Sequence, residues 1–107
     1  MENVDTPRFE IEGVNSYKNG VLLTGRCTRG QVRLGDVFRV ATKRIVVRGE
    51  GHDFSVLKEP VGSISLKVEE IQYFRKFVEL LPAQHSGAIY VSGDGIERIV
   101  AGYEIDL

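Results

Sequence analysis

Residues 20–36 of this chain read GVLLTGRCTRGQVRLGD, a hydrophobic segment that leads into a glycine-punctuated turn and a second segment. Val21, Leu23 and Cys27 fall on one side of an extended backbone and Thr24, Arg26 and Thr28 on the other, as a half-buried strand requires. Gly30 and Gly35 bracket the link, and glycine readily takes the positive φ angles of tight turns. The stretch therefore predicts two strands joined by a short turn.

Alternating apolar and polar residues predict further short strands on both sides of this stretch. Asn19-Gly20 marks a hairpin turn that joins the first strand to the second, since both residues tolerate a left-handed backbone. The further strands span residues 8–14, 36–41, 63–68, 87–92 and 99–105, with a short segment at 45–47. The side chains expected to face inward include Phe9, Ile11, Phe38, Val40, Ile64, Leu66 and Val68.

Residues 68–81 admit two interpretations, a helix or a strand. Apolar residues recur there with the 3.6-residue period of a helix, whereas β-branched and aromatic residues favour a strand. The adjacent Glu69 and Glu70 are consistent with a β-bulge that bends the strand, as closure of a small barrel often requires. On the strand interpretation, six or seven short strands predict an all-β protein, a single antiparallel closed β-barrel.

The size and composition of the chain fit one soluble domain. Its 107 residues allow one core, so we expect one domain over residues 1–107, with 1–7 flexible and 42–62 an insertion or loop. No apolar run approaches the roughly 20 residues that cross a bilayer, and the first residues lack the pattern of a signal peptide. With a single cysteine, these features predict a cytoplasmic protein without a membrane partner.

Charge is unevenly distributed along the chain. Residues 18–48 hold eight lysines and arginines and one acid, Asp36, a net charge of +7. Residues 49–107 hold five bases and ten acids, a net charge of −5. Such a distribution could form a basic surface that attracts a polyanion or an acidic protein. Alternatively, the two parts are neighbouring strands whose outward charges pair across the sheet.

These segments, in this order, resemble the second domain of elongation factor Tu and the related barrel of other translational GTPases. The resemblance covers roughly residues 9–107 and implies a translation-factor β-barrel. It rests on Gly20, Leu22-Leu23, Thr24-Gly25-Arg26, Arg29-Gly30 and Gly35-Asp36, on Ile71-Gln-Tyr-Phe-Arg-Lys76, and on residues 83–93 and 96–102. In elongation factor Tu this barrel helps hold the acceptor end of transfer RNA through an acidic residue. The aligned position here is Gln72, an amide that can hydrogen-bond a base but carries no charge.

The sequence predicts neither catalysis nor a bound cofactor or metal. It contains no Gly-x-x-x-x-Gly-Lys-Ser/Thr loop to hold phosphates, so we expect no GTP hydrolysis by this chain alone. His52 and His85 lack neighbours at a recognised metal-ligand spacing, and Cys27 falls at an inward strand position typical of an inert thiol. We therefore expect a non-enzymatic protein.

The expected function is a binding module that mediates protein interaction, and the alternative is an accessory protein that binds RNA or the ribosome through residues 18–48. Arginine and lysine side chains contact phosphates or acidic partners. They equally well pair with Glu10 and Glu12 on a solvated face of the barrel. The candidate contact residues are Arg26, Arg29, Arg33, Lys43, Arg44, Arg48 and Gln72.

Overall fold

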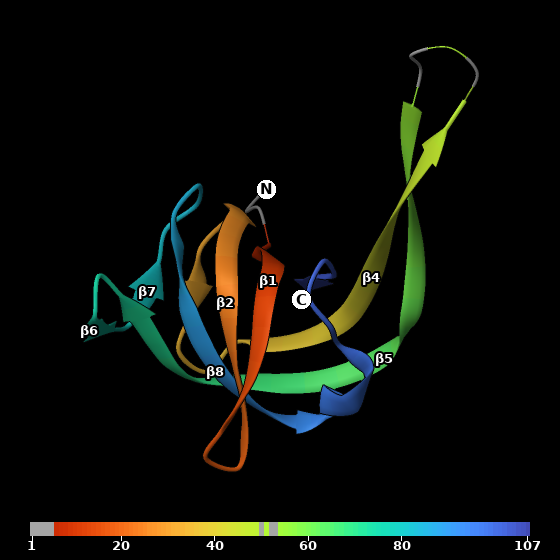
Figure 1. The fold of residues 1–107 in the computed structure, drawn as a ribbon. Helices are drawn as coiled ribbons and strands as arrows, with labels where there is room; N and C mark the ends of the chain where they lie inside the picture. Colours follow the sequence, from red (N-terminus) through yellow and green to blue (C-terminus); the bar gives the residue numbers. More distant parts are fainter. Residues whose placement is uncertain (1–5, 50, 52–53) are drawn as a thin grey trace, which may run out of the picture.

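The computed structural model describes residues 6–49, 51 and 54–107, and in these residues it confirms the predicted antiparallel barrel (Figure 1). Six strands pair side by side to form a ring. The ring closes because the two strands at the ends of the spatial order given next also pair with each other. In spatial order they are β4 (Val37–Arg48), β9 (Glu104–Asp106), β1 (Arg8–Tyr17), β2 (Gly20–Arg29), β8 (Ser86–Asp94) and β5 (Phe54–Tyr73).

Three shorter strands and one turn of helix lie outside this ring. β6 (Lys76–Val78) extends the sheet beside β5, and η1 (Ile96–Arg98) is a single 3₁₀ turn. β3 (Val32–Arg33) and β7 (Leu80–Leu81) form a separate two-stranded sheet. The described residues contain no helix that is both long and apolar enough to cross a membrane.

The core is formed by the inward-facing residues of the barrel strands, largely as the alternation predicts. Phe9, Leu23, Cys27 and Leu66 have no exposed surface, and Gly30 and Gly35 have the predicted positive φ angles of 63° and 87°. The first hairpin is also confirmed, although its turn lies one residue earlier than expected. Tyr17 pairs with Gly20, so the turn residues are Lys18 and Asn19.

Strand is the correct interpretation of residues 68–81. The register of β5 against β8 shifts between Val68 and Glu70, which confirms the predicted bulge at Glu69. The chain then turns back through Phe74 and Arg75 into β6. Phe74 and Phe77, which a helix would have placed in the core, are 79% and 70% exposed.

Two predicted details of single strands are wrong. Val40 is 41% exposed rather than inward, because a bulge between Phe38 and Val40 resets the alternation and turns Ala41 into the core instead. The strand expected at 99–105 is reduced to Glu104–Asp106, and the chain before it forms η1 and a turn. Ile99 is nevertheless buried, so the apolar pattern indicated burial rather than extended structure.

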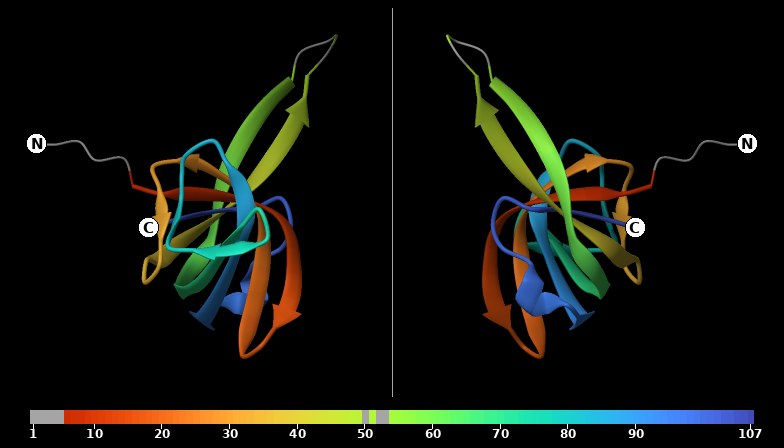
Figure 2. Two further views of the ribbon diagram at one scale, coloured as in Figure 1. Left: turned by 90° about the vertical axis from the view of Figure 1, so that its left-hand side faces the viewer. Right: turned by 90° about the vertical axis from the view of Figure 1, so that its right-hand side faces the viewer.

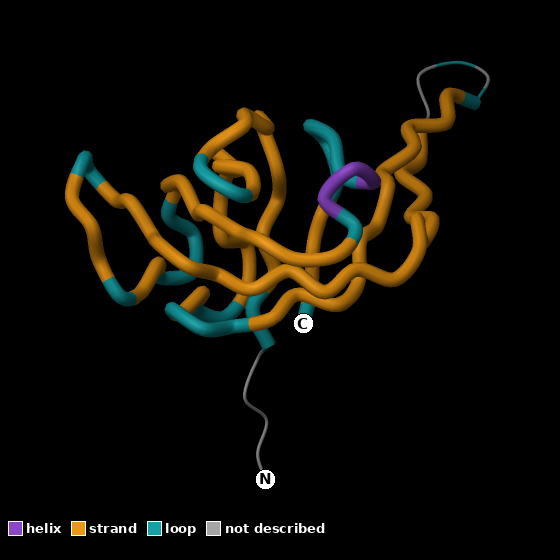
Figure 3. Tube along the Cα trace, turned by 90° about the horizontal axis from the view of Figure 1, so that it is seen from below, coloured by secondary structure: helices purple, strands orange, loops and turns teal. Residues whose placement is uncertain are grey.

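The short strand expected at 45–47 is confirmed as part of β4, whereas the loop expected for the rest of residues 42–62 is wrong for most of that segment. β4 and β5 continue through it as a two-stranded antiparallel ribbon, paired from Thr42 opposite Pro60 to Arg48 opposite Phe54. The ribbon extends away from the barrel, as the views in Figures 1, 2 and 3 show. We call residues 43–48 and 54–59 the arm. Residues 1–5 of the segment expected to be flexible, and His52, lie outside the described residues.

Candidate binding surface

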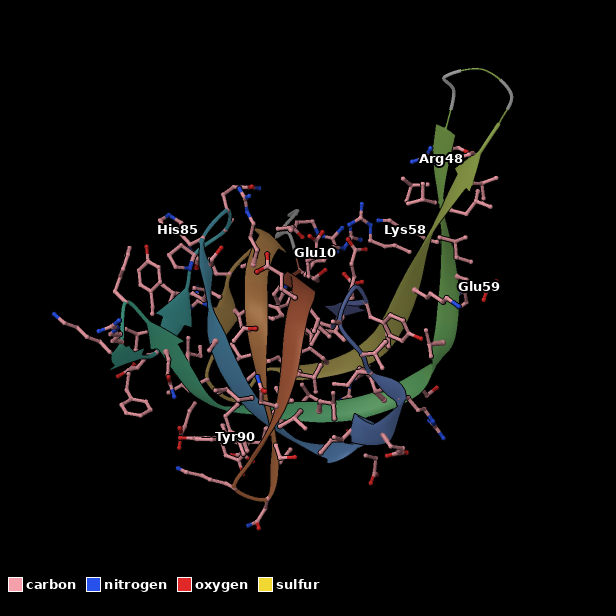
Figure 4. All side chains as sticks on the ribbon, viewed as in Figure 1. Glu10, Arg48, Lys58, Glu59, His85 and Tyr90 are labelled. Carbon is pink, nitrogen blue, oxygen red and sulfur yellow. The ribbon has the colours of Figure 1, made fainter. Side chains whose placement is uncertain are left out.

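The arm has two faces, and one of them is turned toward the barrel. Arg44 of β4 donates to the Glu10 carboxylate of β1 at 3.2 Å, and Lys58 of β5 lies 3.2 Å from the Glu104 carboxylate of β9. Arg44 and Lys58 are cross-strand partners, so they project from the same face of the ribbon. Figure 4 shows Lys58 on the barrel side of the arm and Glu59 on the opposite side.

The alternation of side chains assigns the rest of the arm to these two faces. Val46 and Arg48 lie two and four residues beyond Arg44, so they share the face that is turned to the barrel. Lys43, Ile45, Val47, Leu57 and Glu59 lie on the other face. The candidate residues Arg44 and Arg48 are therefore placed together, whereas Lys43 points away from them.

Both faces of the arm expose apolar side chains. Val46 is 61% exposed, Leu57 53%, and Val47 and Val56 40% each. Isolated two-stranded ribbons are at best marginally stable in water, and adjoining exposed apolar side chains mark surfaces that a partner covers. The sequence predicts a short strand at 45–47, but nothing in it indicated that Val46, Val56 and Leu57 are exposed on a ribbon, since 42–62 was expected to be an insertion or loop. The run Ile45-Val-Val47 was the one available indication of a strand.

The barrel surface below the arm carries paired charges. Asp106 of β9 accepts a hydrogen bond from Arg8 of β1 at 2.9 Å and one from Arg29 of β2 at 3.4 Å. Arg29 also donates to the backbone oxygen of Thr6 at 3.0 Å. The hydrogen bond to Asp106 raises the pKa of Arg8, so this guanidinium stays charged. We use the term corner for the surface formed by these side chains together with the face of the arm that is turned toward the barrel.

The corner contains more cations than acids. Its basic side chains are Arg8, Arg29, Arg44, Arg48 and Lys58, and its acidic side chains are Glu10, Glu104 and Asp106. Asp106 is shared by two arginines, and each of the other two acids neutralises one cation. Among the described residues, the excess of positive charge is thus carried by the β1–β2 end of the corner and by Arg48 on the arm.

The remaining candidate residues lie elsewhere, so the structure does not bring the predicted set together. Arg26 donates to the Gln84 side chain at 3.0 Å, on the outer surface of β2. Arg33 lines a shallow depression with Leu34, Glu79 and Leu80. Gln72 lies in β5, between its partners in β8 and β6 and away from the arm.

A second exposed apolar group lies at the turn between β5 and β6. The Phe74 ring packs against the Tyr73 ring with centroids 4.4 Å apart, and the Tyr73 hydroxyl hydrogen-bonds the His85 ring at Nδ1. Phe77 lies across from Gln72. The helical alternative would have hidden these phenylalanines, and the Phe-Arg-Lys part of the family pattern was the signal that pointed to this turn.

Cys27 is buried in β2, as its inward position predicts. Burial raises the pKa of its thiol above the ordinary value, and its sulfur lies 3.3 Å from the Arg29 backbone oxygen. Among residues 6–49, 51 and 54–107, no three histidine, cysteine or acidic side chains form a group that could hold a metal ion.

Comparison with known proteins identifies the fold. No family model matches the chain, and neither does any curated protein. Two crystal structures of translation elongation factor SelB from Methanococcus maripaludis, the apo form and the complex with the GTP analogue GppNHp, match with TM-scores of 0.67 and 0.68. The chain has the fold of a translation-factor β-barrel. Both matches cover 94% of the chain at 20% sequence identity, which confirms the resemblance in architecture. The chain spans 18% of the length of each SelB chain.

Proposed function

We propose that this translation-factor barrel is a non-enzymatic binding module that captures a protein partner through its arm. The exposed apolar ribbon carries the proposal. Val46 and Leu57, on opposite faces of the arm, are each more than half exposed. A barrel that needed the arm only for its own stability would bury such residues, whereas an interface keeps them for a partner.

The pairing of the cations favours protein over RNA as the partner. RNA binding draws its affinity from lysines and arginines that neutralise phosphates. Arg29, Arg44 and Lys58 already contact carboxylates, which partly neutralises the charge that these three side chains offer to a phosphate backbone. The apolar side chains of the arm have no counterpart on a phosphate backbone.

Affinity capture with matched variants tests this proposal. The tagged chain is used as bait in a lysate of the native host, with and without ribonuclease, and captured proteins are identified and then titrated as purified components. Val46→Thr with Leu57→Thr places β-branched residues, which favour strands, at both positions but replaces two apolar side chains of the arm that are more than half exposed. We expect this variant to weaken binding about tenfold or more, as the loss of central interface contacts does.

The control removes apolar surface elsewhere. Leu34 and Val100 are 44% and 49% exposed and lie outside the arm, so Leu34→Thr with Val100→Thr should bind as the unmodified chain does. Binding that survives both changes in the arm would refute the proposed surface. Capture that ribonuclease abolishes would instead favour the RNA-binding alternative.

A further inference from the structure

The outer edge of β4 in the arm has no neighbouring strand in the described part of the chain. β9 pairs with β4 only at Val40, Ala41 and Thr42. From residue 43 to residue 48, β4 pairs with β5 alone. In such a strand every second residue directs its N–H and C=O groups to the open side, where a further strand can bind them.

The outer edge of β5 is less suited to accept a strand. Pro60 stands opposite Thr42 and has no N–H to donate, a feature typical of protected edges. Just below it, Arg98 of η1 donates to the Ser63 backbone oxygen at 2.7 Å and so occupies one acceptor of β5. β4 contains no proline along its whole length. The open edge of the arm is therefore that of β4.

The charge of β4 selects what can bind there. Its twelve residues include Arg39, Lys43, Arg44 and Arg48 and no acid. A second copy of the chain that paired antiparallel about Val46 would place Arg44 opposite Arg48 on either side of that residue. Like charges directly opposite one another destabilise a strand pair, so this edge disfavours a second copy and favours an acidic strand.

We propose that the outer edge of β4 in the arm binds an extended acidic segment of the partner protein as an additional strand. Acidic side chains of that segment lie opposite Arg44 and Arg48, and an apolar side chain lies opposite Val46 on the same face. The pattern of the bound segment is thus acidic at its ends and apolar at its centre. Backbone hydrogen bonds to the edge supply affinity, and the alternate side chains supply specificity. The inference rests on the proposed protein-binding function.

A peptide of this pattern is a direct probe. Fluorescein-labelled Glu-Glu-Val-Val-Val-Glu-Glu fits the edge in either direction and is titrated against the full chain by fluorescence anisotropy. We expect it to bind the full chain, and we expect the Lys-Lys-Val-Val-Val-Lys-Lys peptide to bind weakly or not at all. The acidic peptide with N-methyl groups on alternate residues keeps its side chains but loses edge hydrogen bonds, and its affinity should fall about tenfold or more.

Charge reversal in the protein provides the reciprocal test. Arg44→Glu with Arg48→Glu should weaken the acidic peptide about tenfold or more and create binding of the lysine peptide. Arg48→Glu alone, which leaves the contact between Arg44 and Glu10 intact, should shift both affinities in the same directions. Lys67→Glu with Lys76→Glu reverses two exposed charges outside the arm and should change neither.

Three results would overturn the proposed strand addition. They are binding of the acidic peptide that ignores the charges at positions 44 and 48, equal binding of the N-methylated peptide, and the absence of binding by the acidic peptide. Partner capture that depends on Val46 and Leu57 but not on Arg44 and Arg48 would also overturn it, while the protein-binding role would stand. Partner capture that ignores Val46 and Leu57 would refute that role itself.

Discussion

Gly25 shows why the Thr-Gly-Arg motif of β2 requires a glycine. A Cβ atom built at this position would lie 2.0 Å from the Glu10 backbone oxygen of the neighbouring strand β1. Neither backbone can give way without breaking the pairing that positions Arg26 and Glu10. We expect Gly25→Ala to lower the free energy of unfolding by about 3 kcal/mol, at the upper end of overpacking effects, as measured by urea denaturation.

Gly35→Ala separates this steric effect from backbone strain. An added methyl group at Gly35 meets open space, and only the positive φ of 87° disfavours a side chain there. We therefore expect a smaller loss of about 1 kcal/mol at Gly35. Equal losses of unfolding free energy at the two positions would show that the close approach of β1 does not explain why the motif has a glycine at position 25.

Glu70 lies at the end of the barrel opposite the arm, where its contacts stabilise the folded state. Lys18 donates to its carboxylate and thereby lowers its pKa, and the Tyr17 hydroxyl donates to it at 3.1 Å. A carboxyl whose pKa is lower in the folded state stabilises the protein above its ordinary pKa of about 4.5, and this contribution is lost as the pH falls through the lowered value. We expect Glu70→Gln to lower the melting temperature at pH 7.

The difference between Glu70→Gln and the unmodified chain should shrink as the pH falls below about 4.5, because the native carboxyl is then protonated as well. Melting curves from pH 7 to pH 3 follow this convergence. Glu12→Gln removes an exposed carboxylate from the same sheet and serves as the control. A difference that stays constant down to pH 3 would contradict the role of the ion pair.

Among the elements, the arm is held to the barrel by two ion pairs at its base. They join Arg44 to Glu10 and Lys58 to Glu104, and the Glu104 side chain is only 8% exposed. Partly exposed pairs of this kind contribute up to about 1 kcal/mol each. Arg44→Gln with Lys58→Gln should therefore speed hydrogen exchange of the arm amides about fivefold, since local opening becomes about 1 kcal/mol easier.

Exchange in the core strands should not change when Glu104→Gln accompanies these two changes, because no buried carboxylate is then left unpaired. Mass spectrometry of deuterium uptake resolves the two regions. Raising the salt concentration to 0.5 M should reduce the difference, since salt screens exposed ion pairs. Lys76→Gln in β6 is the control, and faster exchange throughout the barrel would show that the arm and the core open together.

The elements predicted well from the sequence are those with one face buried. In β1, β2 and residues 63–68 of β5, buried apolar residues alternate with more exposed ones. This alternation predicted both the position of each strand and the side chains that face the core. The arm has no such alternation because both of its faces are exposed. Its residues from Lys43 to Arg48 therefore resembled a polar segment with a short apolar run.

Local irregularities limited the prediction of the candidate surface. The bulge at Arg39 moved Val40 out of the core, and no residue type in that segment signals such a bulge. The arginines of the predicted set could be named from the sequence, but their partners could not. Glu10, Glu104 and Asp106 come from strands far apart in the chain, and only barrel closure brings them to Arg44, Lys58 and Arg29.

At the scale of the whole molecule, barrel closure explains the uneven charge of the chain. Lys18 and Arg29, from the basic stretch 18–48, contact Glu70 and Asp106 from the acidic remainder. The stretch therefore does not form one continuous basic strip. Lys18 lies at the turn of the first hairpin and Arg33 beside the small β3–β7 sheet, while Arg44 and Arg48 lie on the arm. Within the corner, Arg8, Arg29, Arg44 and Lys58 each contact a carboxylate.

The barrel and the arm should be separable. Every side chain of the described core lies outside residues 43–59, and Thr42 stands directly opposite Pro60. Replacing residues 43–59 by Asn-Gly therefore joins two paired positions with a two-residue hairpin turn. The change removes Lys58, so Glu104→Gln is added to avoid a buried unpaired charge.

We expect this armless variant to unfold cooperatively in urea, with a free energy of unfolding within about 1 kcal/mol of that of the full chain, because exposed positions contribute little to stability. Ile105→Ala is the contrasting change. Ile105 is fully buried in the three-residue strand β9, which joins β4 to β1 in the ring, and its truncation should lower the free energy of unfolding by about 2–5 kcal/mol. If removing the arm cost as much as truncating Ile105, the arm would be part of the fold, and its exposed valines would no longer argue for a partner.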